Sequence, residues 1–232
     1  EDTFSVQLMD IGEKLHLLAK DDLQEITYPQ RSLMPDFTER QIDAAQLRDL
    51  VAYLDGLRGG SPAARRSTSP GAVPPSRLLK AADEPAQWLM YSGDYAGRRY
   101  SALNQIGTSN VRQLAVQWTF QSRAPLETTP IVVDGLMYVT GSNSEMWALD
   151  ARTGRAIWRY RHRLPKRMPL CCGPENHGVA VLGDKVFLAT LDAHVVALDA
   201  KTGAVLWDVE ADDYRKGYSF SVAPLAVKGK IL

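Results

Sequence analysis

Two adjacent cysteines, Cys171 and Cys172, are the only cysteines in the 232 residues, and they lie in the segment RMPLCCGPENHG. Neighbouring Cα atoms are about 3.8 Å apart, whereas unstrained disulfides prefer about 4.4–6.8 Å. A bond between these thiols would close a strained ring, and strain of this kind tends to persist at functional sites. The alternative is two free buried thiols, or one structural thiol with an idle neighbour. The cysteines alone leave both alternatives open.

The residues after the pair indicate an irregular loop. Gly173, Pro174 and Gly178 are turn residues and are unusual inside a strand. A loop of this composition favours a ligand-lining role for the cysteines, provided that it lies between two repeated units of the fold.

The C-terminal part of the chain contains a repeat. The stretches MWALDARTGRAIWRY and VVALDAKTGAVLWDV align 49 residues apart, which pairs Gly154 with Gly203 and Trp158 with Trp207. A period near 50 residues, with short alternating strands and Asp/Gly turns, is typical of a β-propeller. We therefore expect each repeat to be one four-stranded blade.

Tryptophan recurs at the end of each repeat. Trp118, Trp158 and Trp207 are large apolar plates, and we expect them to pack between blades rather than to take part in catalysis. Residues 85–232 are predicted to supply about three blades, which cannot close a ring because propellers typically have 4–8. Together with Glu1 in place of an initial Met, this indicates a fragment of a longer protein.

The N-terminal part has a different character. The segment TFSVQLMD alternates like a half-buried strand, and Asp43–Leu57 is predicted to be a helix capped by Asp43. Its apolar stripe consists of Leu47, Leu50, Val51, Leu54 and Leu57. The following stretch, GGSPAARRSTSPGAVPPSR, has the composition of a linker. We divide the chain into residues 1–58, a linker at 59–83, and residues 84–232.

The charge balance excludes some functions. Lys+Arg and Asp+Glu each number 27, so the zero net charge gives no electrostatic reason to expect a nucleic-acid partner. No apolar run approaches the roughly 20 residues of a membrane-spanning helix, and no signal peptide is visible. Membrane association is left open.

Several long motifs of residues 84–232 resemble the pyrroloquinoline quinone (PQQ) dependent alcohol dehydrogenases. They are WLMYSGDYAGRRYSALNQIGTSNVRQLAVQWTF, ETTPIVVDGLMYVT, CCGPENHGVAVLGDKVFLATLDAHVVALDAKTG and GYSFSVAPLAVKGK, in this order. The resemblance implies a mainly β fold, namely part of an eight-bladed PQQ-enzyme propeller.

The resemblance also assigns roles to single residues. Cys171 and Cys172 match the family's vicinal disulfide, whose ring stacks on the planar quinone. Glu127 matches a residue that hydrogen-bonds the cofactor, and Ser221 matches a hydroxyl position that contacts a PQQ carboxylate. His177 stands where the family usually has Arg, near the reactive quinone oxygens. Histidine titrates near neutrality whereas arginine does not, so either the quinone is polarised by a weaker donor or this site is altered.

In the family, a calcium or lanthanide ion acts as a Lewis acid on the quinone, an aspartate takes the alcohol proton, and hydride passes to PQQ. The aspartate and the carboxylate metal ligand are expected beyond Leu232. We therefore assign no catalytic residue within this sequence.

The N-terminal segment SLMPDF, followed by LRDLVAYLDGL, resembles the C-terminal half of a class I cytochrome c domain. This resemblance makes Met34 the axial ligand of a c-type haem, whereas by itself Met34 would be a core methionine. The haem-attaching C-x-x-C-H motif is absent and is expected before Glu1. His16 is expected to be an exposed strand residue. His162 and His194 have no partner pattern and are expected to be surface or packing residues.

The two resemblances together predict a quinohaemoprotein alcohol dehydrogenase that passes electrons from PQQ to haem c and on to a cytochrome or quinone chain. Haem c, PQQ and a disulfide place it in the periplasm. The alternatives are a non-enzymatic propeller scaffold of the outer-membrane assembly type and a PQQ sugar dehydrogenase. His177 favours the scaffold, whereas the cysteine pair, Glu127 and Met34 favour the enzyme.

Overall fold

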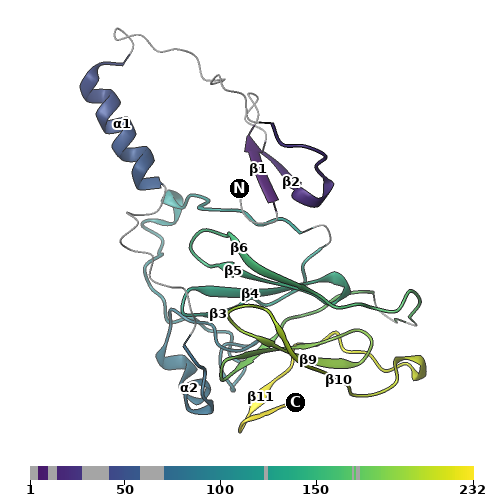
Figure 1. Ribbon diagram of the computed structural model, residues 1–232. Coiled ribbons are helices and arrows are strands. Elements are labelled where there is room, and N and C mark those ends of the chain that lie inside the picture. The colour runs from purple at the N-terminus through teal and green to yellow at the C-terminus, as the bar shows by residue number, and fades with distance from the viewer. Residues whose placement is uncertain are drawn as a thin grey trace. The chain divides into compact units, whose positions relative to one another are not determined.

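The computed structural model describes residues 5–9, 15–27, 42–57, 71–122, 125–168, 170 and 173–232. The chain divides into two compact units, one of Ala19–Ser67 and a larger one of Glu1–Leu18 and Thr68–Leu232 (Figure 1). Within the described ranges, no helix is both long and apolar enough to cross a membrane.

The predicted helix of the smaller unit is confirmed as α1, Ala44–Leu57. The Asp43 carboxylate accepts hydrogen bonds from the N–H groups of Ala45 and Gln46 at 2.8 and 2.9 Å, and the Gln46 side chain accepts from the Asp43 N–H at 3.0 Å. This reciprocal capping box satisfies backbone donors that a helix leaves unpaired at its start. Three members of the apolar stripe are 40–52% exposed, namely Leu47, Leu50 and Val51.

The predicted N-terminal strand is also confirmed. Strand β1, Ser5–Met9, pairs with β2, Leu15–Ala19, and a 3₁₀ turn at Lys20–Asp22 follows. His16 lies on β2 and is half-buried rather than exposed. Met34, the predicted haem ligand, lies outside the described residues.

The larger unit contains two four-stranded antiparallel sheets with strand orders β3-β4-β5-β6 and β10-β9-β8-β7. The first sheet comprises β3 (Ile131–Val133), β4 (Leu136–Gly141), β5 (Glu145–Asp150) and β6 (Ala156–Arg161). The second comprises β7 (Ala180–Leu182), β8 (Lys185–Ala189), β9 (His194–Asp199) and β10 (Val205–Glu210). Each strand of the second sheet begins 49 residues after its counterpart, which confirms the predicted repeat.

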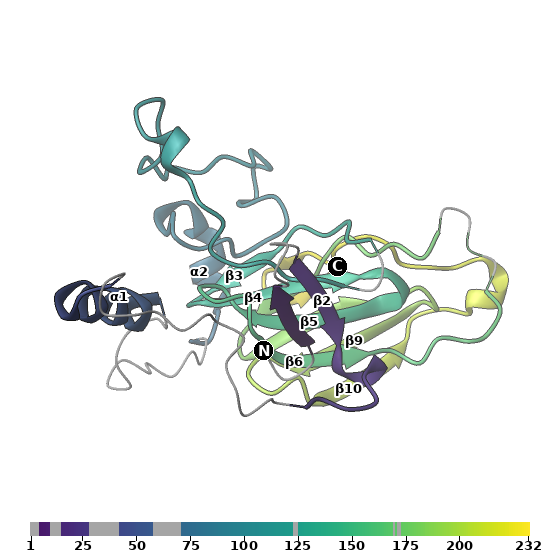
Figure 2. The ribbon, with the colours of Figure 1, turned by 90° about the horizontal axis from the view of Figure 1, so that it is seen from above.

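Figure 1 shows the first sheet above the second, and in Figure 2, seen from above, the two overlap. A third hairpin follows, formed by β11 (Ala226–Val227) and β12 (Lys230–Ile231). Residues 88–122 contribute one isolated bridge, Trp88 to Val132, and no sheet of their own. The described residues thus hold two complete four-stranded units and the start of a third, fewer than the three blades predicted.

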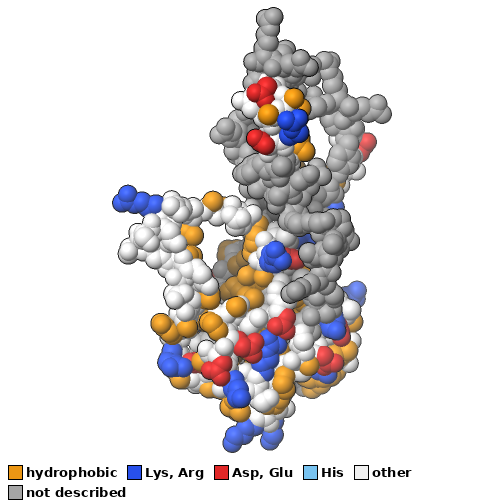
Figure 3. Space-filling model, turned by 90° about the vertical axis from the view of Figure 1, so that its left-hand side faces the viewer, with side chains coloured by type: hydrophobic (Ala, Val, Ile, Leu, Met, Phe, Trp, Pro, Cys, Tyr) orange, Lys and Arg blue, Asp and Glu red, His pale blue; other side chains and the backbone are white. Residues whose placement is uncertain are grey.

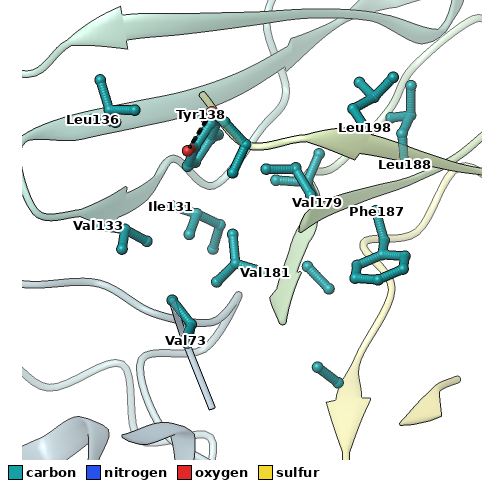
Figure 4. Packing of buried hydrophobic residues seen from close by; sticks show 14 of the residues in the cluster. Val73, Ile131, Val133, Leu136, Tyr138, Val179, Val181, Phe187, Leu188 and Leu198 are labelled. Carbon is teal, nitrogen blue, oxygen red and sulfur yellow. Dashed lines mark hydrogen bonds between the residues drawn. The ribbon is translucent and has the colours of Figure 1, made fainter. Parts of the chain in front are cut away.

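The core lies between the two sheets. Figure 4 shows Ile131, Val133 and Tyr138 of the first sheet facing Val179 and Val181 of the second. The Tyr138 ring is 1% exposed, and its hydroxyl donates to the Ala200 carbonyl at 2.9 Å. Burial raises the pKa of Tyr138, so the hydroxyl remains a donor at any physiological pH.

Two of the three tryptophans, Trp118 and Trp158, pack as predicted. The Trp158 ring lies against Gly203 of the second sheet's last turn, and its indole N–H donates to the Ala200 carbonyl at 3.2 Å. Trp118 repeats the arrangement on the first sheet, with its ring against Gly154 and its N–H on the Ala151 carbonyl at 3.2 Å. Trp207, the third of the series, is 39% exposed.

Part of the predicted linker belongs to the packed unit. Helix α2, Pro75–Leu79, and a 3₁₀ turn at Ala81–Asp83 lie within residues 59–83. Val73, which bridges to Gly183, is buried, as are Leu78 and Ala81. The Pro-rich composition of this segment does not indicate these contacts, because the buried side chains meet partners that are distant in sequence.

Ion pairs join α2 to the first sheet. The Arg77 guanidinium pairs with Glu84 and Asp134 at 2.7 Å each. These charge-assisted hydrogen bonds hold the pKa of both carboxyl groups below the ordinary range. Figure 3 shows this side of the molecule, where acidic and basic side chains are interspersed rather than separated by sign.

Candidate functional site

The loop after the cysteines is held between the two sheets by Asn176. This side chain is 1% exposed. Its Nδ2 donates to the Ala189 carbonyl at the end of β8 at 2.8 Å, and its Oδ1 accepts from the Gly178 N–H at 3.1 Å. The Asn176 carbonyl in turn accepts from the Thr140 hydroxyl on β4 at 3.0 Å. The loop is therefore fixed to both sheets by buried polar groups with partners.

His177 joins three separate segments. Its N–H donates to the Ser221 carbonyl at 2.8 Å, and its carbonyl accepts from the Thr129 N–H at 3.0 Å. Its ring Nδ1 lies 2.8 Å from the Glu127 carbonyl oxygen. Since a carbonyl can only accept, Nδ1 carries the proton of this hydrogen bond, and Nε2 is the remaining ring nitrogen.

The structure therefore brings together Glu127, His177 and Ser221, three of the five residues predicted to bind the cofactor. The Glu127 side chain is exposed, and His177 and Ser221 are half-buried. The contacts run through the backbone carbonyls of Glu127 and Ser221, so the structure brings the three segments together, and their side chains are a carboxylate, an imidazole and a hydroxyl.

The other two predicted residues, Cys171 and Cys172, lie outside the described residues. The chain immediately after them is well fixed, because the Pro174 carbonyl accepts from the Asn143 N–H at 2.8 Å. Gly178 has a φ of +140°, and a Cβ there would lie 3.2 Å from the Thr129 carbonyl oxygen. The close approach of the loop to Thr129 thus requires glycine.

Arg99 is a nearby residue that the sequence did not reveal. Its Nη2 donates to the Thr129 hydroxyl at 3.0 Å, and its guanidinium lies over the Tyr91 ring at 4.6 Å from the ring centroid. It adds a permanent positive charge next to the segment that holds His177. Nothing in the surrounding RRY sequence marks this neighbourhood, since the contact spans 30 residues.

The sequence shows no partner pattern for His162 and His194, yet in the structure each of them lies against a carboxylate. His162 contacts Asp192, and His194 contacts Asp208, at 3.0 and 2.7 Å. The two imidazole centroids are 5.4 Å apart. This second polar cluster lies on other strands and uses none of the residues around His177.

The profile of the PQQ family described as "Glucose/ethanol/alcohol dehydrogenase, beta-propeller domain" matches residues 88–209, which is just over half of the chain. The chain belongs to this family. The match covers both four-stranded sheets and the loop that carries His177, and it agrees with the family implied by the motifs.

Similar proteins carry consistent descriptions. The quinohemoprotein alcohol dehydrogenase ADH-IIG of Pseudomonas putida is 41% identical over 190 residues, which is 78% of this chain and 26% of that protein. The quinoprotein alcohol dehydrogenase PedH of Pseudomonas putida is 39% identical over 165 residues, which is 69% of this chain and 28% of that protein. The chain therefore spans about a quarter of the length of these PQQ-family relatives.

Solved structures agree with this assignment. The structure of ADHIIG from Pseudomonas putida HK5 superposes with a TM-score of 0.64 at 40% identity, covering 70% of this chain and 25% of that chain. A europium-containing methanol dehydrogenase superposes with a TM-score of 0.63 at 37% identity, covering 67% and 28%. The two sheets are thus blades of a PQQ-family propeller, and are called the first and second blade from here on.

Proposed function

We propose that the protein oxidises an alcohol with bound PQQ, and that this chain supplies part of the cofactor pocket. The observation that carries the proposal is the placement of His177, whose backbone and ring join the Glu127 and Ser221 segments. These are the positions at which the family contacts its cofactor. The relatives' names describe alcohol, ethanol and butanol dehydrogenases.

The donor set fits the group. PQQ is planar, carries several carboxylates and, when bound, accepts hydride from an alcohol. The Ser221 hydroxyl would donate to a carboxylate of PQQ, and Glu127 would orient the ring through hydrogen bonds. His177, with Nδ1 already occupied by the Glu127 carbonyl, offers Nε2 to the ligand. By the family resemblance, Cys171 and Cys172 would form a vicinal disulfide that covers one face of the ring.

We propose calcium or a lanthanide as the ion that would act as Lewis acid in this pocket. One similar solved structure is described as a europium-containing methanol dehydrogenase. Its carboxylate ligands and the aspartate base are contributed by residues outside this sequence. Arg99 lies close enough to the Thr129 segment to balance negative charge there. We propose that the part of the pocket on this chain positions the cofactor and does not by itself catalyse the reaction.

We further propose that residues 1–58 form part of a cytochrome c domain, with Met34 as axial ligand of haem c. Several relatives are named quinohemoproteins. Two are named by their acceptor, as 1-butanol dehydrogenases (quinone) and (cytochrome c). A segment of linker composition between the domains would raise the effective concentration of the haem near the quinone. We propose the periplasm as the protein's compartment, because haem c and a disulfide would both suit an oxidising compartment.

The test uses the full-length protein, produced in a periplasm with PQQ and calcium. Its absorption spectrum is recorded before and after addition of a primary alcohol, and in parallel after addition of glucose. Haem bands that change to the reduced form with the alcohol, and not with glucose, establish both cofactors and the class of substrate.

Reduction by glucose alone would identify a sugar dehydrogenase instead. A folded protein without quinone or haem absorption would overturn the proposal and leave the propeller scaffold. A protein with quinone but no haem absorption would overturn only the cytochrome part.

A further inference from the structure

A cluster of four polar side chains lies between the first and second blades, apart from the cofactor pocket. His162 follows β6 of the first blade, whereas Asp192, His194 and Asp208 belong to the second. His162 and Asp192 have side chains only 6% exposed, and those of His194 and Asp208 are 28% and 36% exposed. The cluster is thus closed on one side and open to solvent on the other.

His162 is oriented as metal-ligating histidines are. Its Nε2 lies 3.0 Å from Asp192 Oδ2, and the other Asp192 oxygen accepts from the Thr190 hydroxyl at 2.6 Å. Because a carboxylate only accepts, the proton of neutral His162 is on Nε2, and Nδ1 keeps a lone pair. Metal-bound histidines almost always donate their other nitrogen to a carboxylate or carbonyl in this way.

His162 Nδ1, which accepts a hydrogen bond from the Tyr160 hydroxyl at 3.0 Å, also faces further ligands. It lies 3.9 Å from Asp208 Oδ2, and Asp208 Oδ1 lies 2.7 Å from His194 Nδ1. One ligand atom from each of these three residues lies within 4.8 Å of the others. Tetrahedral ligands at 2.0–2.2 Å from zinc are separated by about 3.4 Å, so binding needs only a small rearrangement of the more exposed His194 and Asp208 side chains.

The equivalent position of the first blade shows what this cluster replaces. Glu145 and Arg159 lie 49 residues before His194 and Asp208. They form an ion pair in which the guanidinium neutralises the carboxylate. In the second blade the same pair of positions holds an imidazole and a carboxylate, and a second imidazole reaches in from the first blade. Where the first blade has an ion pair, the second therefore has two imidazoles and one carboxylate, which can bind a cation together.

We propose that His162, His194 and Asp208 form a binding site for a divalent transition metal, with zinc as the best fit, that links the first blade to the second. Two imidazoles and one carboxylate suit zinc, whereas calcium and lanthanides prefer all-oxygen ligands. Asp208 and Asp192 together balance the two positive charges. A metal bound at His162 Nδ1 replaces the hydrogen bond from the Tyr160 hydroxyl, which lies 3.0 Å from this atom.

The experiment titrates the full chain with zinc against a fluorescent chelator, with excess calcium present and the thiols blocked by iodoacetamide. We expect one zinc per chain. His194→Gln and Asp208→Asn each raise the Kd at least tenfold, and Asp192→Asn raises it about 10- to 100-fold through the orientation of His162. Asp184→Asn and His16→Gln are the matched controls and leave the Kd within twofold.

A double variant separates loss of ligands from loss of folding. His194→Glu with Asp208→Arg rebuilds the ion pair of the first blade, so it should fold with an unchanged far-ultraviolet circular dichroism spectrum and bind no zinc at this site. The proposal is overturned if wild type binds no zinc, or if zinc binds equally well to this double variant.

Discussion

The ring of Trp158 in the first blade rests on Gly203 of the second, and a Cβ at Gly203 would lie 2.6 Å from two ring atoms. The glycine has a φ of +71°, which side chains rarely adopt. Its turn is fixed separately, because the Asp199 carboxylate accepts from the N–H groups of Lys201 and Thr202 at 3.0 and 2.8 Å. The close contact of the Trp158 ring with residue 203 therefore requires glycine, because a Cβ at this position would overlap with the ring.

We predict that Gly203→Ala lowers the free energy of unfolding by about 2–4 kcal/mol, since the methyl group displaces the Trp158 ring and the backbone is strained. Gly183→Ala is the matched control, because Gly183 has a φ of +63° and nothing within 4 Å of the added Cβ. This substitution should lower the free energy of unfolding by only about 1–2 kcal/mol, which is the cost of a side chain in the left-handed backbone conformation. Urea unfolding measures both, and equal losses would contradict a packing role for Trp158.

A pH-dependent contribution to stability is expected from Arg77. Its guanidinium holds the pKa of Asp134 below the ordinary 3.8. A depressed pKa adds stability that is complete above the unfolded value and disappears as the pH falls through the folded value. Arg77→Gln should therefore cost about 1–3 kcal/mol at pH 7, and its difference from wild type should shrink below pH 4.

Urea unfolding at pH 7, 5, 4 and 3 tests this prediction. Arg98→Gln is the control, because Arg98 pairs with Asp94 on the surface and is 61% exposed. Exposed pairs of this kind contribute about 0.5 kcal/mol or less. A difference between wild type and Arg77→Gln that stays constant with pH would exclude the ion pairs as its source.

The blades could be predicted from sequence because their signals are local. Strand alternation and the Asp–x–x–x–Gly turns recur 49 residues apart, and the same short-range rule placed the Asp43 cap of α1. Each of these features depends on residues a few positions apart.

Features that depend on contacts between segments were missed. The Pro-rich residues around Val73 have linker composition, yet Val73 is buried against the second blade through its bridge to Gly183. His162 and His194 share no local pattern, because one follows the first blade and the other begins β9 of the second. Arg99 reaches Thr129 across a long irregular segment. Such pairings follow from how the blades stack.

The role of Asn176 in fixing the loop of residues 173–178 can be tested by substitution. Asn176→Ala removes the bonds to the Ala189 carbonyl and the Gly178 N–H, and leaves those buried groups without partners. We expect a loss of about 1–3 kcal/mol in stability and a PQQ affinity at least tenfold weaker in the full-length protein. The change is measured by urea unfolding and by fluorescence titration with PQQ.

Asn110→Ala is its matched control. Asn110 makes the same two kinds of bond, accepting from the Gly107 N–H at 2.8 Å and donating to the Gln105 carbonyl at 2.7 Å, in an exposed turn. It should change stability by about 1 kcal/mol or less and leave PQQ affinity unchanged. Equal effects of both variants on PQQ affinity would show that Asn176 has no particular part in placing the loop.

The cysteine pair gives the last prediction. If Cys171 and Cys172 are bonded, a peptide containing both, taken from unreduced protein, has a mass two hydrogens below that of the dithiol form, and neither sulfur reacts with iodoacetamide until a reductant is added. Cys172→Ser then weakens PQQ binding, because the strained ring no longer covers one face of the cofactor. Two thiols that alkylate freely in folded, periplasmically produced protein would contradict the disulfide and remove one wall of the proposed pocket.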